Sequence, residues 1–160
     1  MRNSIFLLFF IGIFLTSCDE NRVFDQYQSV ENSWDAKKPV VFTLPKLPAD
    51  KFYNMFINLR ANKDYPFNNI FLIVAMEMPN KKVLVDTLEY QMANPDGTMM
   101  GTGFSDIKES KLFYKQKFQF KYKGQYKINI KHALRKTGNT QGVDKLVGVS
   151  DVGFRIENIQ

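Results

Sequence analysis

The chain is poor in the residues that form covalent cross-links and metal sites, with one cysteine and one histidine among its 160 residues. A single cysteine cannot form a disulfide within the chain, and a single histidine cannot supply the imidazoles of a histidine-based metal site. No glycine-rich loop of the Walker type is present to hold phosphates. We therefore expect no metal and no cofactor, and a domain stabilised by packing alone.

The sequence also lacks an apolar run long enough to span a membrane as a helix. The run near the N-terminus covers residues 5–15, which is well short of the roughly 20 residues that a transmembrane helix needs. Arg2 precedes the run, and small residues follow it. This order is typical of a secretory signal peptide, which we assign to residues 1–17.

The end of this segment carries the only cysteine. Leu15, Thr16, Ser17 and Cys18 fit the lipobox of bacterial lipoproteins, in which a thiolate is alkylated by a lipid donor and small residues admit the signal peptidase. We predict that Cys18 becomes the lipid-bearing N-terminus. Two or three acyl chains such as palmitate would then hold the protein stably, because one chain binds a membrane only marginally. The alternatives are an ordinary signal peptide with a chance cysteine, or a buried N-terminal helix.

Positive charge exceeds negative charge, giving a net charge of +6 and a pI near 9.3. An exported chain does not meet nucleic acid, so we do not expect that partner. Lysines alternate with apolar residues at 114–118 and 121–123, a pattern typical of the solvated face of an antiparallel sheet. A functional basic patch is the alternative interpretation.

No stretch has the pattern of an amphipathic helix of three turns. Period-2 alternation and turn residues instead predict strands at residues 40–44, 53–60, 70–78, 83–92, 112–120, 126–130 and 147–159. The continuous apolar run at 70–78 suggests a central strand covered on both faces. Seven to nine short strands predict an all-β fold, an antiparallel β-sandwich of jelly-roll type.

The domain organisation follows from these elements. After the signal peptide we expect a lipid-anchored tether and first extended segment at residues 18–38, then the sandwich at residues 39–160. Trp34, the only tryptophan, is expected to close one end of the core. Residues 94–97 form a strong turn motif, and Ser150 with Asp151 is interpreted as a turn within the last hairpin.

A search for catalytic residues is mostly negative. His132 stands alone and is expected to be structural, and no serine lies in a Gly-x-Ser-x-Gly elbow. Glycoside hydrolysis needs two carboxylates, but each candidate lies in a turn or on a polar strand face, where a solvated carboxylate is the default. The candidates are Asp86, Glu89, Asp96 and Asp106. We therefore predict that the protein is not an enzyme.

Aromatic residues near predicted loops could contact a carbohydrate or a protein. They are Tyr65, Phe67, Phe104 and Tyr122. The simpler interpretation is that most of these rings belong to the core.

Several short motifs follow one another at characteristic spacing. They are the lipobox with a Trp about fifteen residues later, residues 59–62 with 65–69, Asp86-Thr87-Leu88, residues 94–97 with 101–103, residues 124–126, and residues 146–149 with 151–157. In this order they resemble the GldH gliding-motility lipoprotein family of Bacteroidetes. The resemblance covers nearly the whole mature chain.

The resemblance implies an envelope lipoprotein of the gliding machinery. It implies association with the type IX secretion apparatus, stabilisation of partner lipoproteins, no enzyme activity and no small-molecule substrate. In Bacteroidetes, acidic residues after the lipidated cysteine accompany export to the outer membrane, and Asp19 follows Cys18. A surface glycan-binding module of jelly-roll type is the alternative function.

Overall fold

A computed structural model describes residues 20–103, 105–135, 138 and 141–159. The described chain contains ten strands: β1 (Arg22–Ser29), β2 (Ser33–Asp35), β3 (Val40–Thr43), β4 (Phe52–Ala61), β5 (Asn69–Glu77), β6 (Val83–Gln91), β7 (Lys108–Gln119), β8 (Lys127–His132), β9 (Lys145–Val147) and β10 (Val149–Asn158). None of the described residues belongs to a helix that could cross a bilayer.

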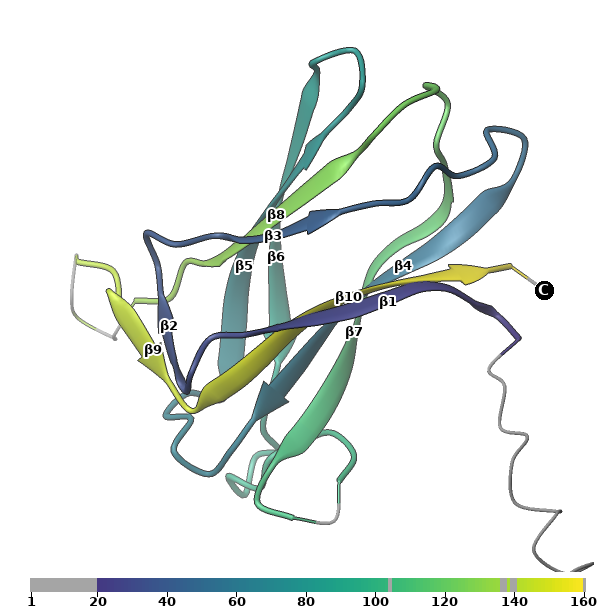
Figure 1. Ribbon diagram of the computed structural model, residues 1–160. Helices are drawn as coiled ribbons and strands as arrows, with labels where there is room; N and C mark the ends of the chain where they lie inside the picture. The colour runs from purple at the N-terminus through teal and green to yellow at the C-terminus, as the bar shows by residue number, and fades with distance from the viewer. Residues whose placement is uncertain (1–19, 104, 136–137, 139–140, 160) are drawn as a thin grey trace, which may run out of the picture.

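The strands form two four-stranded antiparallel sheets that pack face to face (Figure 1). One sheet has the order β1-β10-β4-β7, the other has the order β3-β8-β5-β6, and β2 pairs with β9 in a small third sheet. With that small pair set aside, successive strands are divided between the sheets as in a jelly roll. The predicted all-β, jelly-roll-like sandwich is confirmed.

The core lies between the two sheets because alternate residues of each strand point inward. In β5, Ile70, Leu72, Val74 and Met76 are fully buried. Residues 71, 73 and 75 on the opposite face are only half-buried. The strand is central, as predicted, but only one of its faces is covered. The prediction of two covered faces was wrong because the apolar residues of the outer face have no layer packed over them.

Aromatic rings fill much of the space between the sheets. Phe154 stacks with Phe42 at a ring distance of 6.1 Å and meets Tyr114 edge-on at 6.2 Å. Such pairs add about 0.5–1.5 kcal/mol to the effect of burial. Trp34 is 1% exposed, which confirms that it closes part of the core.

The segment expected to be a tether and extended segment contains two strands of the fold. β1 pairs with β10 from Arg22 to Ser29, and β2 pairs with β9 through Trp34. The sandwich therefore begins before the predicted boundary at residue 39. β1 could not be recognised in the sequence because it is an edge strand in which only one residue, Phe24, is buried.

The last predicted strand divides into β9 and β10, and the division differs from the prediction. Ser150 and Asp151 lie within β10, so the interpretation of these residues as a turn was wrong. The chain instead turns at Gly148, where φ is +84°. A glycine adopts this left-handed conformation at little cost.

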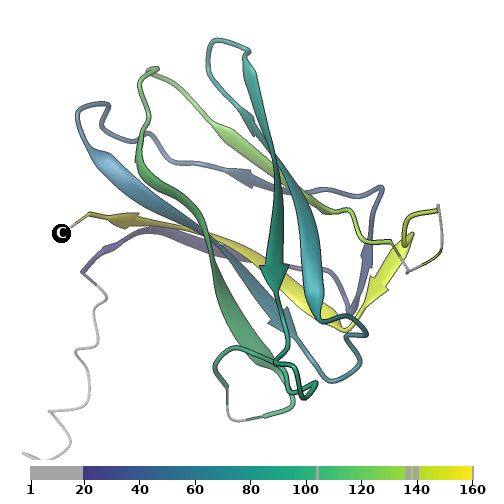
Figure 2. The same ribbon diagram turned by 180° about the vertical axis from the view of Figure 1, so that it is seen from behind.

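Both described chain ends lie at one end of the sandwich (Figure 2), where the Asn158 backbone N–H donates to the Asn21 carbonyl at 2.8 Å. We call it the terminal end, and its connections are residues 44–51, 78–82 and 120–126. The opposite or distal end carries the connections at residues 30–39, 62–68, 92–107 and 133–148.

Candidate functional site

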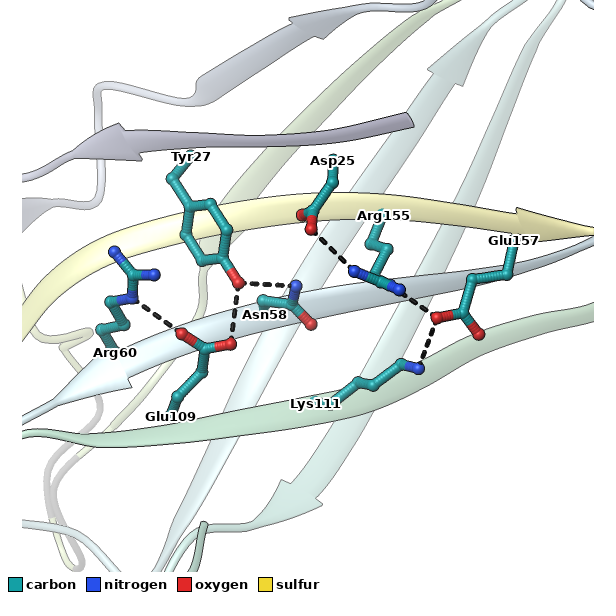
Figure 3. A network of polar contacts seen from close by, with 8 residues as sticks. All are labelled: Asp25, Tyr27, Asn58, Arg60, Glu109, Lys111, Arg155 and Glu157. Atoms are coloured by element: carbon teal, nitrogen blue, oxygen red, sulfur yellow. Dashed lines mark hydrogen bonds and ion pairs between the residues drawn. The ribbon is translucent and has the colours of Figure 1, made fainter. Parts of the chain in front are cut away.

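A network of charged and polar side chains covers the outer face of the β1-β10-β4-β7 sheet (Figure 3). Each strand contributes two residues separated by one position, because this spacing places both side chains on the same face. The pairs are Asp25 and Tyr27 on β1, Arg155 and Glu157 on β10, Asn58 and Arg60 on β4, and Glu109 and Lys111 on β7.

One half of the network is organised around the Tyr27 ring. The Tyr27 hydroxyl donates to Glu109 Oε1 at 2.8 Å and accepts from Asn58 Nδ2 at 2.9 Å. Arg60 Nε donates to Glu109 Oε2 at 2.8 Å, and its guanidinium carbon lies 4.1 Å from the centre of the Tyr27 ring. The ring passes across β10 at Gly153, where a Cβ atom would lie 2.8 Å from two ring carbons. This glycine therefore allows β1 to reach across the sheet to β7.

The other half is organised around Arg155. Its Nη1 atom lies 2.8 Å from Asp25 Oδ2, and its Nε lies 2.6 Å from Glu157 Oε1. The Lys111 ammonium group lies 2.7 Å from the same Glu157 oxygen and 4.1 Å from the centre of the Phe56 ring. The Arg155 side chain is only 13% exposed. Ion pairs shielded to this degree couple more strongly than ordinary surface pairs.

The ionisation states in the network follow from burial and pairing. Burial and the neighbouring Glu109 carboxylate raise the pKa of Tyr27 to about 12, so this phenol keeps its proton and remains a donor. Burial alone would raise the pKa of Glu157, but hydrogen bonds from Lys111 and Arg155 outweigh it and lower that pKa. The Arg60 pKa is raised, chiefly by its hydrogen bond to Glu109. At neutral pH Tyr27 is therefore uncharged, whereas Glu157 is anionic and Arg60 is cationic.

This arrangement fits recognition better than catalysis. Its three cationic side chains each contact a carboxylate, and its phenol is held as a neutral donor. Tyrosine and arginine on a rigid framework are enriched where proteins bind one another. Two buried oxygens, Asp25 Oδ1 and Asn58 Oδ1, have no hydrogen-bond partner in the described part of the chain. The face thus presents a preformed polar surface, and these two acceptors lie buried beneath it.

His132 lies in the core. It is 2% exposed, and its Nε2 lies 2.9 Å from the Trp34 carbonyl oxygen. Burial lowers its pKa, although the contact with Trp34 and the charge of Asp35 act in the opposite direction. The ring meets the Trp34 ring edge-on at 5.3 Å. The structure therefore places this histidine in a structural position, as predicted from the sequence.

The four carboxylates considered for hydrolysis are occupied by separate structural contacts. Asp86 accepts from the Tyr114 hydroxyl at 2.8 Å, while Glu89 accepts from Asn69 at 2.6 Å. They lie three positions apart on β6 and therefore on opposite faces. Asp96 caps its turn through Thr98, whose hydrogen bonds lower the Asp96 pKa. Asp106 lies 3.9 Å from Lys63.

The aromatic residues proposed as an interaction surface do not form one surface, although Tyr65 and Phe67 contact each other. Tyr65 is 6% exposed and donates to the Asn69 carbonyl at 2.7 Å, so this ring is part of the core and its assignment to a surface was wrong. Phe67 is half-buried against it. Tyr122 is 44% exposed but lies at the terminal end, away from both. Phe104 lies outside the described residues, and no platform for a sugar is formed by the other three.

Two further predictions concern the lipid attachment site and metal binding. Cys18 and the lipobox lie outside the described residues. Among the residues that are described, no three histidine, cysteine, aspartate or glutamate side chains come close enough to hold a metal ion.

Sequence reasoning missed the network of Figure 3. Its members come from four segments spread between residues 25 and 157, and only the pairing of strands brings them together. One feature could have indicated it, namely that polar residues recur at alternate positions in four separate strands. This pattern predicts a polar face but not which residues meet.

The sequence is similar to one protein-family model and to gliding motility lipoproteins of two bacteria. A family model described as GldH lipoprotein matches residues 22–156. The sequence is 58% identical over 151 residues to "Gliding motility lipoprotein GldH" of Flavobacterium johnsoniae, covering 94% of each chain. It is 46% identical to "Gliding motility lipoprotein GldH homolog" of Christiangramia forsetii, covering 96% of this chain and 94% of the relative.

Solved structures resemble the chain only partially. The VP2 subviral particle of infectious bursal disease virus overlaps 91% of this chain and 36% of its own, with a TM-score of 0.37 and 12% identity.

Proposed function

The chain belongs to the GldH family of gliding motility lipoproteins, and from this membership we propose that it docks onto and stabilises partner lipoproteins of the gliding machinery, in association with type IX secretion. The observation that carries the proposal is the 58% identity to the Flavobacterium johnsoniae protein across 94% of both chains. As a family lipoprotein, it is held in the cell envelope by lipid.

We infer that the lipid is attached at Cys18 and that the membrane is the outer membrane. Cys18 is the only cysteine, and Asp19 follows it directly. The fold supports the anchor position, because strand β1 begins at Arg22, only a few residues after Cys18. The described domain is thus held close to the membrane on a short tether.

We further propose that the protein acts by binding and not by turnover. Asp86, Glu89, Asp96 and His132 are each held by structural contacts, and Asp106 is an exposed carboxylate 3.9 Å from Lys63. The network on the outer sheet face offers a rigid polar surface built from four strands. Such a surface can hold a partner without any motion of the backbone.

The test is genetic and biochemical. Deleting the gene is expected to abolish spreading on agar, and restoring the chain is expected to recover it. Restoring the Cys18→Ser chain is expected to fail, because the protein would leave the membrane. The matched control is Ser17→Ala, which keeps a small residue in the lipobox. Metabolic labelling with an alkyne palmitate analogue checks that only Cys18→Ser loses the lipid.

The same strains test the partners. Capture of the lipidated protein from membranes, followed by mass spectrometry, is expected to recover envelope lipoproteins of the gliding and secretion machinery. Their levels are expected to fall in the deletion strain. Unchanged spreading, secretion and partner levels after deletion would contradict the proposed function.

A further inference from the structure

Positive charge is concentrated at one end of the molecule. The three connections of the terminal end contain one acidic residue, Asp50, and the lysines Lys46, Lys51, Lys81, Lys82, Lys121 and Lys123. In the four distal connections the charges balance, with cations at 37, 38, 63, 135, 136 and 145 and anions at 31, 35, 64, 96, 106 and 144. The terminal-end connections therefore carry a net charge of +5, from six lysines and one aspartate, whereas the distal connections are neutral.

These connections form one continuous surface. The Leu44 N–H donates to the Tyr126 carbonyl at 2.9 Å, and Gln119 Nε2 donates to the Ala49 carbonyl at 2.8 Å. Gly124 packs so closely on Pro79 that a Cβ atom would lie 2.8 Å from the proline ring. The loops at 44–51, 78–82 and 120–126 thus hold one another in place. We call them together the basic end.

The lysines of the basic end are available to a partner. All six are exposed, and none lies within ion-pair distance of a carboxylate among the described residues. On the outer face of the β1-β10-β4-β7 sheet, by contrast, Arg60, Lys111 and Arg155 each pair with acids. A cluster of unpaired lysines repels itself and is stabilised by an anionic surface.

Exposed aromatic rings lie among these lysines. Phe52 is 51% exposed and lines a shallow hollow with Lys51, Lys117 and Ile159. Tyr122 is 44% exposed between Lys121 and Lys123, and its loop is held by the Tyr126 hydroxyl, which accepts from the Tyr122 N–H at 3.0 Å. Aromatic rings beside lysines are typical of residues that sit at the headgroup level of a bilayer.

The short segment between Cys18 and Asn21 keeps the basic end close to the membrane that holds the lipid. Asn21 is fixed to Asn158 at the terminal end, and three residue steps separate it from Cys18. A fully extended chain covers about 11 Å in three steps, so the basic end cannot lie far from the lipid. Asp19 and Glu20 offset part of the charge, but exposed Arg22 and Lys117 at adjoining strand ends add to it.

We propose that the basic end docks on the anionic phospholipid headgroups of the bilayer that holds the lipid anchor. The proposal rests on lipid attachment at Cys18, as inferred above. Docking orients the sandwich with its distal end away from the membrane. The lipid and the lysines then act as two linked attachments, which fix the direction in which the domain presents its surfaces.

The lipidated protein in vesicles provides the test. Cys18 is the only natural cysteine, so Gln125→Cys at the basic end or Asn68→Cys at the distal end gives a single free thiol for a fluorophore. The vesicles contain phosphatidylcholine, with or without phosphatidylglycerol. They also contain a lipid that carries a nitroxide on its headgroup, which quenches a fluorophore that lies close to the membrane surface. With phosphatidylglycerol, we expect strong quenching at position 125 and little at position 68. Salt at about 0.5 M should reduce the quenching by screening.

Charge reversal separates docking from anchoring. Near an anionic membrane, each lysine changes the ratio of docked to undocked protein about five-fold. The double variant Lys121→Glu with Lys123→Glu should therefore lower this ratio at least about 25-fold. The matched control, Lys37→Glu with Lys38→Glu, makes the same charge change at the distal end and should leave quenching at position 125 intact.

Flotation of the vesicles distinguishes the proposed lipid attachment at Cys18 from the proposed docking of the basic end. Protein that floats with the vesicles but shows equal quenching at positions 125 and 68 would overturn docking while leaving the anchor in place. Equal quenching at position 125 with and without phosphatidylglycerol would also overturn it, because docking on anionic headgroups requires the anionic lipid. Protein that fails to float would overturn both proposals.

Discussion

Gly153 is the residue on which the outer network depends, because the Tyr27 ring lies where its side chain would be. A Cβ atom there would approach two Tyr27 ring carbons at 2.8 Å and Asn58 Cβ at 3.1 Å. We expect Gly153→Ala to lower the free energy of unfolding by about 1–3 kcal/mol, as overpacking does. Urea unfolding followed by tryptophan fluorescence measures this change.

The Tyr27→Ala background provides the control for this prediction. Without the ring, the added methyl group has space, so Gly153→Ala should cost less there than in the natural chain. The double-mutant cycle gives the coupling between the two positions. Equal costs in both backgrounds would show that the ring does not occupy this position.

His132 makes the stability of the protein depend on pH. An unfolded histidine has a pKa near 6.5, and burial lowers the pKa of the folded one. Below pH 6.5 the unfolded chain therefore binds the proton more readily. The stability contributed by the neutral ring is fully present above pH 6.5 and is lost as the pH falls toward the folded pKa. The slope is at most about 1.4 kcal/mol per pH unit.

The measurement is urea unfolding at pH 7.5 and at pH 5.5, for the natural chain and for His132→Asn. Trp34, 5.3 Å from the His132 ring, reports unfolding through its fluorescence. The variant is expected to be less stable at pH 7.5 but to lose less stability on acidification. An identical loss in both proteins would assign the pH dependence to the carboxylates instead.

At the scale of the element, the break between β9 and β10 depends on Gly148. Its φ is +84°, and an added Cβ atom would collide with the Tyr65 backbone nitrogen. Gly148→Ala therefore combines a left-handed alanine with a backbone clash, and we expect a cost of at least about 3 kcal/mol.

Gly97 is a matched control for this prediction. It has the same φ of +84°, but no atom lies within 4 Å of the Cβ position. Gly97→Ala should therefore cost only about 1–2 kcal/mol, the price of the left-handed conformation alone. Thermal unfolding of the two variants compares them. Equal losses would mean that the contact with Tyr65 is not what makes Gly148 necessary.

Strands with one buried face could be predicted from the sequence. The alternation in β4, β6 and β8 predicted their positions to within a few residues, and the turn predicted at residues 94–97 contains Gly97 at a φ of +84°. β1 was not predicted as a strand, because an edge strand with a single buried residue has almost no period-2 pattern. Neither the break at Gly148 nor the Tyr27–Glu109 contact could be predicted, since both depend on segments distant in the sequence.

At the scale of the whole molecule, β1 and β2 are the first two strands of the described fold and belong to its core. They bury Phe24 and Trp34, and β1 covers one edge of β10. Losing a buried large aromatic side chain costs about 3–5 kcal/mol, whereas a domain has about 5–15 kcal/mol in total. A chain that begins at residue 39 is therefore expected not to fold, whereas a chain that begins at residue 20 should.

Circular dichroism and heat-induced unfolding of the two shortened chains measure this difference. The chain from residue 20 should show β-sheet and a cooperative transition, and the chain from residue 39 should show neither. A cooperative transition in both would mean that β1 and β2 are an addition to the sandwich. The expected result would instead mean that both strands are part of its stable core, so that a force acting on the chain before Arg22 passes through β1 into the β1-β10 pairing.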